Sequence, residues 1–185
     1  MSIGFALLQA FWFFLPAYVA NPTAVLFGGG RPIDGGRVLA DGHRLFGDGK
    51  TWRGLVGGVL SGILVGLIQW PVAAIDPDLS WGPFPRGLLP IVVLPIGALL
   101  GDLLGSYVKR RAGREKGART PGLDWYDFYL GAFALLVIAD YAFFTSHYVA
   151  GEAIYGFLFI TVITPVLHRA VNILGFQLGK KDVPW

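Results

Sequence analysis

Three aspartates, Asp102, Asp124 and Asp127, stand where carboxylates could perform chemistry. Asp102 lies inside an apolar stretch, where a charge is costly unless it faces a cavity or a partner. Asp124 and Asp127 are three residues apart at the start of another apolar stretch, so a helix would place both on one face. Mg²⁺ prefers carboxylate ligands, and we therefore predict that these three residues bind magnesium and are catalytic. For Asp124 and Asp127 taken alone, helix capping is the simpler alternative.

Cationic and hydroxyl side chains accompany Asp102. Ser106 and Lys109 follow it by four and seven residues, which is the spacing of one helix face, and Arg110 comes next. A carboxylate followed by cations suits a phosphate group with its metal ion. We predict Lys109 to be catalytic, and Ser106 and Arg110 to bind nucleotide or phosphate.

The segment 28–54 is a second candidate for phosphate binding. It contains nine glycines, five cations and three aspartates, and glycine-rich backbone can form anion-binding concavities. Its end, residues 47–51, leads directly into an apolar stretch, whose helix N-terminus would favour a phosphate. Including a polar residue just before the segment, the predicted contacts of the phosphate group are Asn21, Gly47, Asp48, Lys50, Thr51 and Arg53.

Simpler interpretations of this region stay open. The end of the segment resembles a P-loop, but Arg44 stands where that motif requires a glycine, so we reject the P-loop. A flexible loop with arginines at a membrane surface is the main alternative. Asn21, followed by Pro22, is equally well explained as the end of a helix.

Composition decides which elements must position these residues. The chain has 185 residues, of which 54% are hydrophobic and only 15% are charged, against about 25% charged in an ordinary soluble domain. Too little charge is available to cover a soluble globule. The chain has no cysteine, which excludes disulfides, thiolate metal sites and cysteine nucleophiles.

Five apolar windows approach the length of about 20 residues that a membrane-spanning helix needs. We therefore predict an all-α integral membrane protein that forms a single membrane domain over residues 1–185. The predicted cytoplasmic loops are 27–53 and 109–126. The predicted spans are 3–26, 54–75, 88–108, 127–147 and 152–174.

Lysines and arginines are enriched in cytoplasmic loops, and they orient these spans. Fourteen of the 15 fall in the two long loops or at the end of the last span, and Arg86 is the exception. The prediction is a multi-pass protein of the cell membrane with its N-terminus outside and its C-terminus in the cytoplasm. The polar site would then lie at the cytoplasmic rim.

The run from Gly101 to Asp127 resembles the signature of the CDP-diacylglycerol synthases, the CTP:phosphatidate cytidylyltransferases. The chain departs from the bacterial pattern at Leu123 and Trp125, beside Asp124, and it is much shorter. The segments 21–22, 32–36 and 41–54, with the five-span length, resemble a small archaeal branch, the CDP-archaeol synthases. The matching positions of the first signature are Gly101, Asp102, Leu103, Ser106, Lys109, Arg110, Ala112, Gly113, Pro121, Gly122, Asp124 and Asp127.

This resemblance implies a reaction and its partners. CTP and 2,3-bis-O-(geranylgeranyl)-sn-glycerol 1-phosphate would give the CDP-linked lipid and pyrophosphate, in a bilayer and without nucleic acid. A phosphate monoester is already mostly dianionic at neutral pH, so positioning and charge neutralisation suffice. Asp102, Asp124 and Asp127 would hold Mg²⁺. The oligomeric state is left open, with a homodimer as one alternative.

Two other functions are weighed against this one. A small transporter or lipid-moving protein should carry polar groups through the bilayer midplane, and the second span offers only Ser61 and Gln69. A CDP-alcohol phosphotransferase should carry an Asp-Gly-x-x-Ala-Arg motif, of which residues 41–44 are a poor match. Both are kept as alternatives.

Overall fold

The computed structural model describes residues 2–115, 118–181 and 183–184, and Lys116 is the one basic loop residue outside them. The described residues are helical, with two isolated β-bridges and no strand. The long helices are α1 (Ile3–Leu26), α2 (Trp52–Gln69), α3 (Leu88–Arg111), α4 (Leu123–Ala139) and α6 (Ala153–Gln177). The short elements are η1 (Trp70–Ala74), η2 (Pro77–Leu79), α5 (Tyr141–Phe144) and the π-helical η3 (Thr145–Val149).

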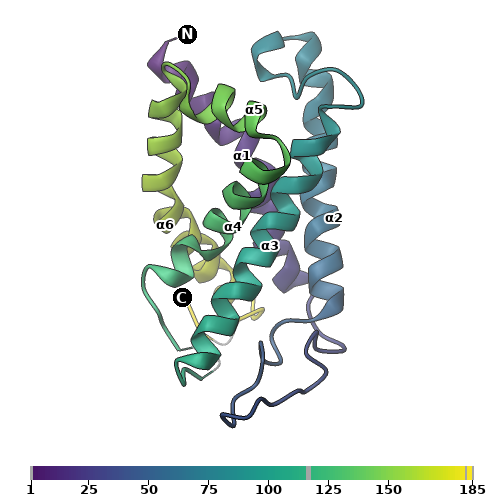
Figure 1. Cartoon of the computed structure of the whole chain (residues 1–185), viewed down its shortest axis with the longest axis vertical. Helices are drawn as coiled ribbons and strands as arrows, with labels where there is room; N and C mark the ends of the chain where they lie inside the picture. Colours follow the sequence, from purple (N-terminus) through teal and green to yellow (C-terminus); the bar gives the residue numbers. More distant parts are fainter. Residues whose placement is uncertain (1, 116–117, 182, 185) are drawn as a thin grey trace.

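Four helical segments are long and apolar enough to cross a membrane: α1, α2 continued by η1, α3 and α6. The predicted all-helical membrane protein is therefore confirmed. The chain leaves α1 for the long loop at one end of the bundle, which is also the end where α3 and α6 finish (Figure 1). The N-terminus lies at the opposite end (Figure 1).

The predicted span 127–147 differs most from the structure, because it is not one continuous helix. Helix α4 already begins at Leu123 and ends at Ala139. Asp140 has the non-helical backbone angles φ −144° and ψ 73°, and its side chain accepts a hydrogen bond of 2.9 Å from the Phe143 amide. An aspartate in this role caps a new helix, so the chain breaks and restarts as α5.

Glycines on α2 explain how closely the first three helices pack. Gly54, Gly58, Gly62 and Gly66 are spaced by four residues and are all buried. A methyl group on Gly62 would lie 2.6 Å from the Pro16 carbonyl oxygen of α1 and 2.5 Å from the Pro95 side chain of α3. Small residues at such spacing let helix backbones approach in membranes. The stripe therefore fixes α2 against both neighbours.

The core at the end remote from the long loops is aromatic. Phe13 and Phe14 of α1 are fully buried. Phe14 stacks on Phe133 of α4 with ring centroids 4.8 Å apart, and Phe13 meets the edge of Trp81 at 4.8 Å. These contacts hold α1 and α4 together and leave the polar side chains to gather at the other end.

Candidate functional site

A polar cavity of about 160 Å³ lies where the last turns of α3 and the first turns of α4 meet the end of the first loop. Six of the site residues that the sequence predicted line it, and the first and last of them, Lys50 and Asp127, are 77 residues apart in the chain. The predicted site residues in its wall are Lys50, Asp102, Lys109, Arg110, Asp124 and Asp127.

Two ion pairs organise this cavity. The Lys50 Nζ lies 2.5 Å from Asp102 Oδ2, and the Lys109 Nζ lies 2.7 Å from Asp124 Oδ1. All four side chains are between 17% and 25% exposed, so the pairs are partly buried but reachable by water. Helix α3 supplies one member of each pair, which explains the seven-residue spacing of Asp102 and Lys109.

Asp127 lies between these pairs because α3 carries glycine opposite it. A methyl group on Gly105 would lie 2.2 Å from Asp127 Oδ2, and one on Gly101 would lie 2.1 Å from the Asp127 carbonyl oxygen. Asp127 is only 8% exposed. The other carboxylate oxygen accepts a 2.7 Å hydrogen bond from the Phe128 amide. The close approach of α4 to α3 thus places Asp127 beside Asp102.

Asp124 also shapes the loop before α4. Its Oδ2 accepts a 2.6 Å hydrogen bond from the Thr120 amide. Gly122 stands at the N-cap with φ 85°, a left-handed conformation that favours glycine. The capping alternative is not borne out: the N-cap is Gly122 and no side chain caps the helix, and Asp124 instead binds an amide of the preceding loop with one oxygen and faces Lys109 with the other.

The first loop is folded around Asp34. This buried carboxylate accepts hydrogen bonds from the amides of Gly36, Phe46 and Gly47, at 3.0 to 3.1 Å. Arg44 pairs with it at 2.7 Å. Burial alone would raise the pKa of Asp34, but Arg44 and the amides outweigh burial and hold it well below its usual range. These contacts give the loop a hydrogen-bonded frame around one carboxylate, and they support the phosphate-binding interpretation over the flexible-loop alternative.

Arg111 fastens this frame to the end of α3. Its guanidinium pairs with Asp41 and donates to the carbonyl oxygens of His43 and Arg44, at 3.2 and 2.6 Å. The two loops that the sequence placed on one face are therefore in contact.

The remaining predicted residues lie around the cavity rather than in it. Thr51 is the N-cap of α2 and accepts a 3.1 Å hydrogen bond from the Gly54 amide. Asp48 is 70% exposed and pairs with Arg44 at 2.8 Å. Arg53 is exposed, whereas Ser106 is buried in α3. Gly47, at φ 97°, serves the turn that donates to Asp34.

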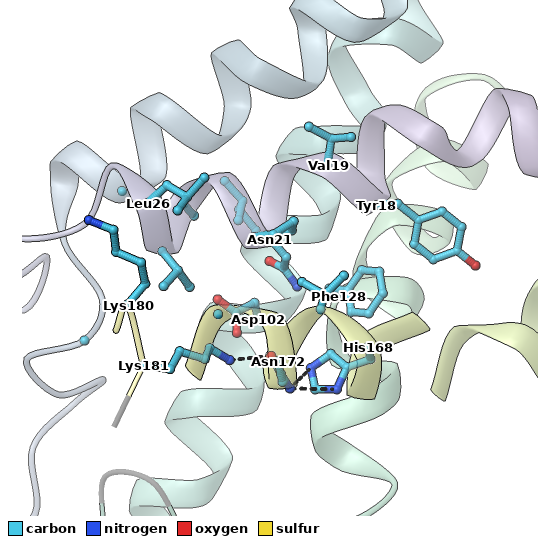
Figure 2. A pocket seen from close by; sticks show the side chains of 18 of the residues that line it. Tyr18, Val19, Asn21, Leu26, Asp102, Phe128, His168, Asn172, Lys180 and Lys181 are labelled. Carbon is cyan, nitrogen blue, oxygen red and sulfur yellow. Dashed lines mark hydrogen bonds between the residues drawn. The ribbon is translucent and has the colours of Figure 1, made fainter. Parts of the chain in front are cut away.

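A larger cavity of about 520 Å³ adjoins the polar one, and its wall is mostly apolar. It is bounded by the end of α1, the start of α2 and the last turns of α6. Figure 2 shows Asn21, Asp102 and Phe128 around it. The Oδ1 of Asn21 is buried without a hydrogen-bond partner in the described part of the chain. Exposed apolar side chains, Leu26, Val171, Leu174 and Leu178, mark its edge.

Three residues without a predicted site role line both cavities: His168, Asn172 and Lys181. Lys181 donates a 2.5 Å hydrogen bond to Asn172 Oδ1, and the Asn172 amide nitrogen lies 3.2 Å from the His168 ring (Figure 2). Burial lowers the pKa of the Lys181 ammonium, and nearby Asp102 partly opposes this. The sequence feature that could have indicated a role for His168 and Asn172 is their four-residue spacing, which places two polar side chains on one face of an apolar helix.

The described side chains do not form a complete metal-binding site by themselves. Among residues 2–115, 118–181 and 183–184, no three His, Asp or Glu side chains are grouped closely enough to hold an ion by themselves. Two of the three predicted ligands instead face lysines.

The fold and the site define a class: a helical membrane protein with a charged cavity joined to an apolar one, as an enzyme that acts on a lipid requires. Comparison with known proteins identifies the family. A family described as CarS-like CDP-archaeol synthase matches residues 3–185. The chain therefore belongs to the CDP-archaeol synthase family, and the resemblance predicted from its motifs is confirmed.

Individual relatives agree. A CDP-archaeol synthase of Methanosphaerula palustris is 51% identical over 172 residues, which cover 92% of this chain and 99% of that protein. A CDP-archaeol synthase of Thermococcus kodakarensis is 46% identical, with 95% of each chain covered. A solved structure of an intramembrane enzyme for archaeal membrane lipid biosynthesis superposes with a TM-score of 0.68 and 36% identity, covering 90% of this chain and 94% of that one. Family membership decides against the transporter and phosphotransferase alternatives.

Proposed function

We propose that this membrane enzyme transfers the cytidylyl group of CTP to a prenylated glycerol 1-phosphate, giving CDP-archaeol and pyrophosphate. Family membership makes the chain a CTP-dependent cytidylyltransferase that acts on a lipid phosphate. The observation that supports the assignment of sites is the pair of adjoining cavities, one charged and one apolar, which share Lys50 and Asp102.

The apolar cavity is assigned to the prenyl chains. Its volume of about 520 Å³ and its apolar wall suit hydrocarbon, and its edge carries side chains that already face the bilayer. With the chains between α1 and α6, the phosphate of the lipid would lie at the shared boundary. The buried, unpartnered Asn21 Oδ1 is assigned to the nucleotide instead, because the diether glycerol phosphate has no hydrogen-bond donor, whereas the ribose hydroxyls and the cytosine amino group do.

The charged cavity is assigned to the triphosphate of CTP. An oxygen of the lipid phosphate attacks the α-phosphorus of CTP, and the bond from that phosphorus to the pyrophosphate oxygen breaks. No proton needs to be removed, because the attacking phosphate monoester is mostly dianionic at pH 7. Lys50, Lys109 and Arg110 neutralise the charge on the triphosphate and on the leaving pyrophosphate.

The donor set of this cavity fits Mg²⁺. Asp102, Asp124 and Asp127 all contribute to its wall, and ammonium groups already sit at 2.5 and 2.7 Å from two of them. Because these three carboxylates share the cavity with four cationic side chains, Mg²⁺ would bind together with the triphosphate, whose oxygens and water would be its further ligands. When bound, Mg²⁺ supplies charge neutralisation at the phosphate oxygens.

The first loop is assigned to the nucleotide. Gly47, Asp48 and Arg53 would contact its outer parts, while Thr51 holds the start of α2 and the preceding Lys50 in place. Ser106, Asp102 and Lys109 share one face of α3, so Ser106 lies behind the reacting groups. These roles are inferred from where the residues lie relative to the first loop, which Asp34 and Arg111 hold in place.

We also assign the fifth membrane crossing to α4, α5 and η3 together. The chain starts α4 at the site end and begins α6 at the opposite end (Figure 1). The N-terminus then lies outside and the site faces the cytoplasm of a cell membrane. Because the chain has no cysteine, single-cysteine variants at Ala40, which is exposed in the first loop, and at Ser80 test this with an impermeant maleimide. In intact cells, only the variant at Ser80 should be labelled.

The reaction is tested with purified protein, radiolabelled CTP, ATP, GTP or UTP, Mg²⁺, and either a prenyl or an acyl glycerol phosphate. We expect a cytidylyl lipid and pyrophosphate from CTP and the prenyl substrate, and no product after chelation of Mg²⁺. Absence of product with every combination would overturn the assignment. If the reaction rate were unchanged after chelation, only the assignment of Mg²⁺ would be wrong.

A further inference from the structure

Lys181 reaches the site from beyond the end of α6. Its aliphatic stem lies along Gly175, where an added methyl group would be 3.6 Å from the lysine Cγ and Cδ. Its ammonium donates to Asn172 Oδ1 at 2.5 Å, and Asn172 in turn lies 3.2 Å from the His168 ring. Figure 2 shows Lys181 directed at Asn172, whereas the neighbouring Lys180 points away. The end of the chain is therefore folded back onto the site.

The charge of Lys181 is not balanced as those of the other cavity lysines are. Lys50 and Lys109 each pair with an aspartate, at 2.5 and 2.7 Å. Lys181 instead donates to a neutral amide, and no carboxylate of the described residues lies within ion-pair distance of it. A partly buried ammonium that forms no ion pair among the described residues is suited to bind an anionic ligand.

The position of Lys181 indicates which anion that is. The residue lines both cavities and therefore lies at their boundary. A substrate whose chains fill the apolar cavity would present its phosphate at this boundary. The outer phosphates of CTP would lie within the polar cavity, beside Lys109 and Arg110, which line that cavity alone.

We propose that Lys181 is a specificity-determining residue that binds the phosphate of the lipid substrate, with Asn172 as the positioning residue that orients its ammonium. The inference rests on the proposed function. It makes the C-terminal end of the chain part of the active site. It also selects a lipid phosphomonoester over the same lipid without phosphate.

Steady-state kinetics with the full-length Lys181→Met variant test this. At saturating CTP, the KM for the lipid phosphate should rise about tenfold or more, as expected for one lost hydrogen bond to a charged group. The KM for CTP should stay within about twofold of wild type. Lys181→Arg should restore most of the affinity, which a merely structural role for the stem would not require. Arg169→Met removes an exposed charge from the preceding helix α6 and should change neither KM.

Equilibrium binding without CTP separates this inference from the proposed function. Wild-type protein should bind a dialkyl glycerol phosphate at least about tenfold more tightly than the corresponding dialkyl glycerol, and Lys181→Met should lose that preference. This holds whether or not product forms. An unchanged preference in the variant, or an equal rise in the KM for CTP and for lipid, would overturn the assignment of Lys181.

Discussion

The two cavities of this enzyme are built in opposite ways. The smaller, of about 160 Å³, is enclosed by charged pairs from α3, α4 and the first loop. The larger, of about 520 Å³, is enclosed by apolar faces of α1 and α6. They meet at five shared residues: Lys50, Asp102, His168, Asn172 and Lys181.

This difference teaches how a water-soluble and a lipid substrate can be brought together. Charged side chains need partners when they leave water, and two ion pairs, Lys50–Asp102 and Lys109–Asp124, stand in the polar wall. Apolar side chains need none, so the apolar wall can stay open towards the bilayer. Substitutions in one wall should therefore affect one substrate, and substitutions at the boundary should affect the reaction itself.

The largest effect is expected at the boundary. Asp102→Asn removes the charge that pairs with Lys50 and that we assign to Mg²⁺, so kcat should fall at least about 100-fold. Asp78→Asn, an exposed aspartate at the opposite end of the bundle, is the matched control and should keep wild-type activity. Initial rates of CDP-lipid formation measure both. Wild-type turnover by Asp102→Asn would show that the cavities do not meet at the reacting groups.

A change at Gly105, which packs against the Asp127 side chain, should give the next largest effect. Gly105→Ala places a methyl group 2.2 Å from Asp127 Oδ2 and must push that carboxylate away. We expect activity to fall about 10- to 100-fold and stability to fall by about 1–3 kcal/mol, the usual cost of overpacking. Thermal unfolding and initial rates measure these changes. Gly4→Ala, which has open space, should alter neither, and an active Gly105→Ala would mean that Asp127 is not needed in place.

A change in the apolar wall should affect the lipid alone. Val171→Trp adds bulk at the edge of the larger cavity, so the KM for the lipid phosphate should rise about fivefold, corresponding to about 1 kcal/mol. The KM for CTP should be unchanged. Val166→Trp, on the lipid-facing side of the same helix, serves as the control. Equal changes in both KM values would contradict the separation of the two walls.

The smallest effect is expected at Asp34, which lines neither cavity. Its pKa is lowered in the folded loop, so its stabilisation is complete above its unfolded value of about 3.9 and is lost as pH falls below it. Hydrogen exchange of the Phe46 and Gly47 amides should therefore lose protection below about pH 4 in wild type. Asp34→Asn should lack this dependence. The same pH profile in both proteins would assign the loss to another group.

Spacing along single helices predicted much of the site. Asp102 and Lys109 lie on one face of α3 because seven residues make nearly two turns, and both reach the cavity. The apolar windows likewise predicted α1, which has the predicted bounds, whereas the predicted span 127–147 is interrupted at Asp140. Such features are local, and a sequence displays them directly.

Contacts between distant segments could not be read in this way. Lys181 joins the site only because the chain folds back along Gly175, and nothing in the spacing of Lys181 indicates that. The break at Asp140 was missed for a related reason. An aspartate in an apolar run suggests a hydrogen bond to a neighbouring helix as readily as the cap that it forms here.

The Lys50–Asp102 pair has a thermodynamic consequence, because it belongs to both cavities. A ligand on either side that draws the ammonium from the carboxylate changes the charge that the other ligand meets. Such coupling is reciprocal: each substrate must alter the affinity of the other by the same factor. The dissociation constant of either substrate measured alone therefore does not describe its affinity in the ternary complex, and the difference between the two constants measures the coupling.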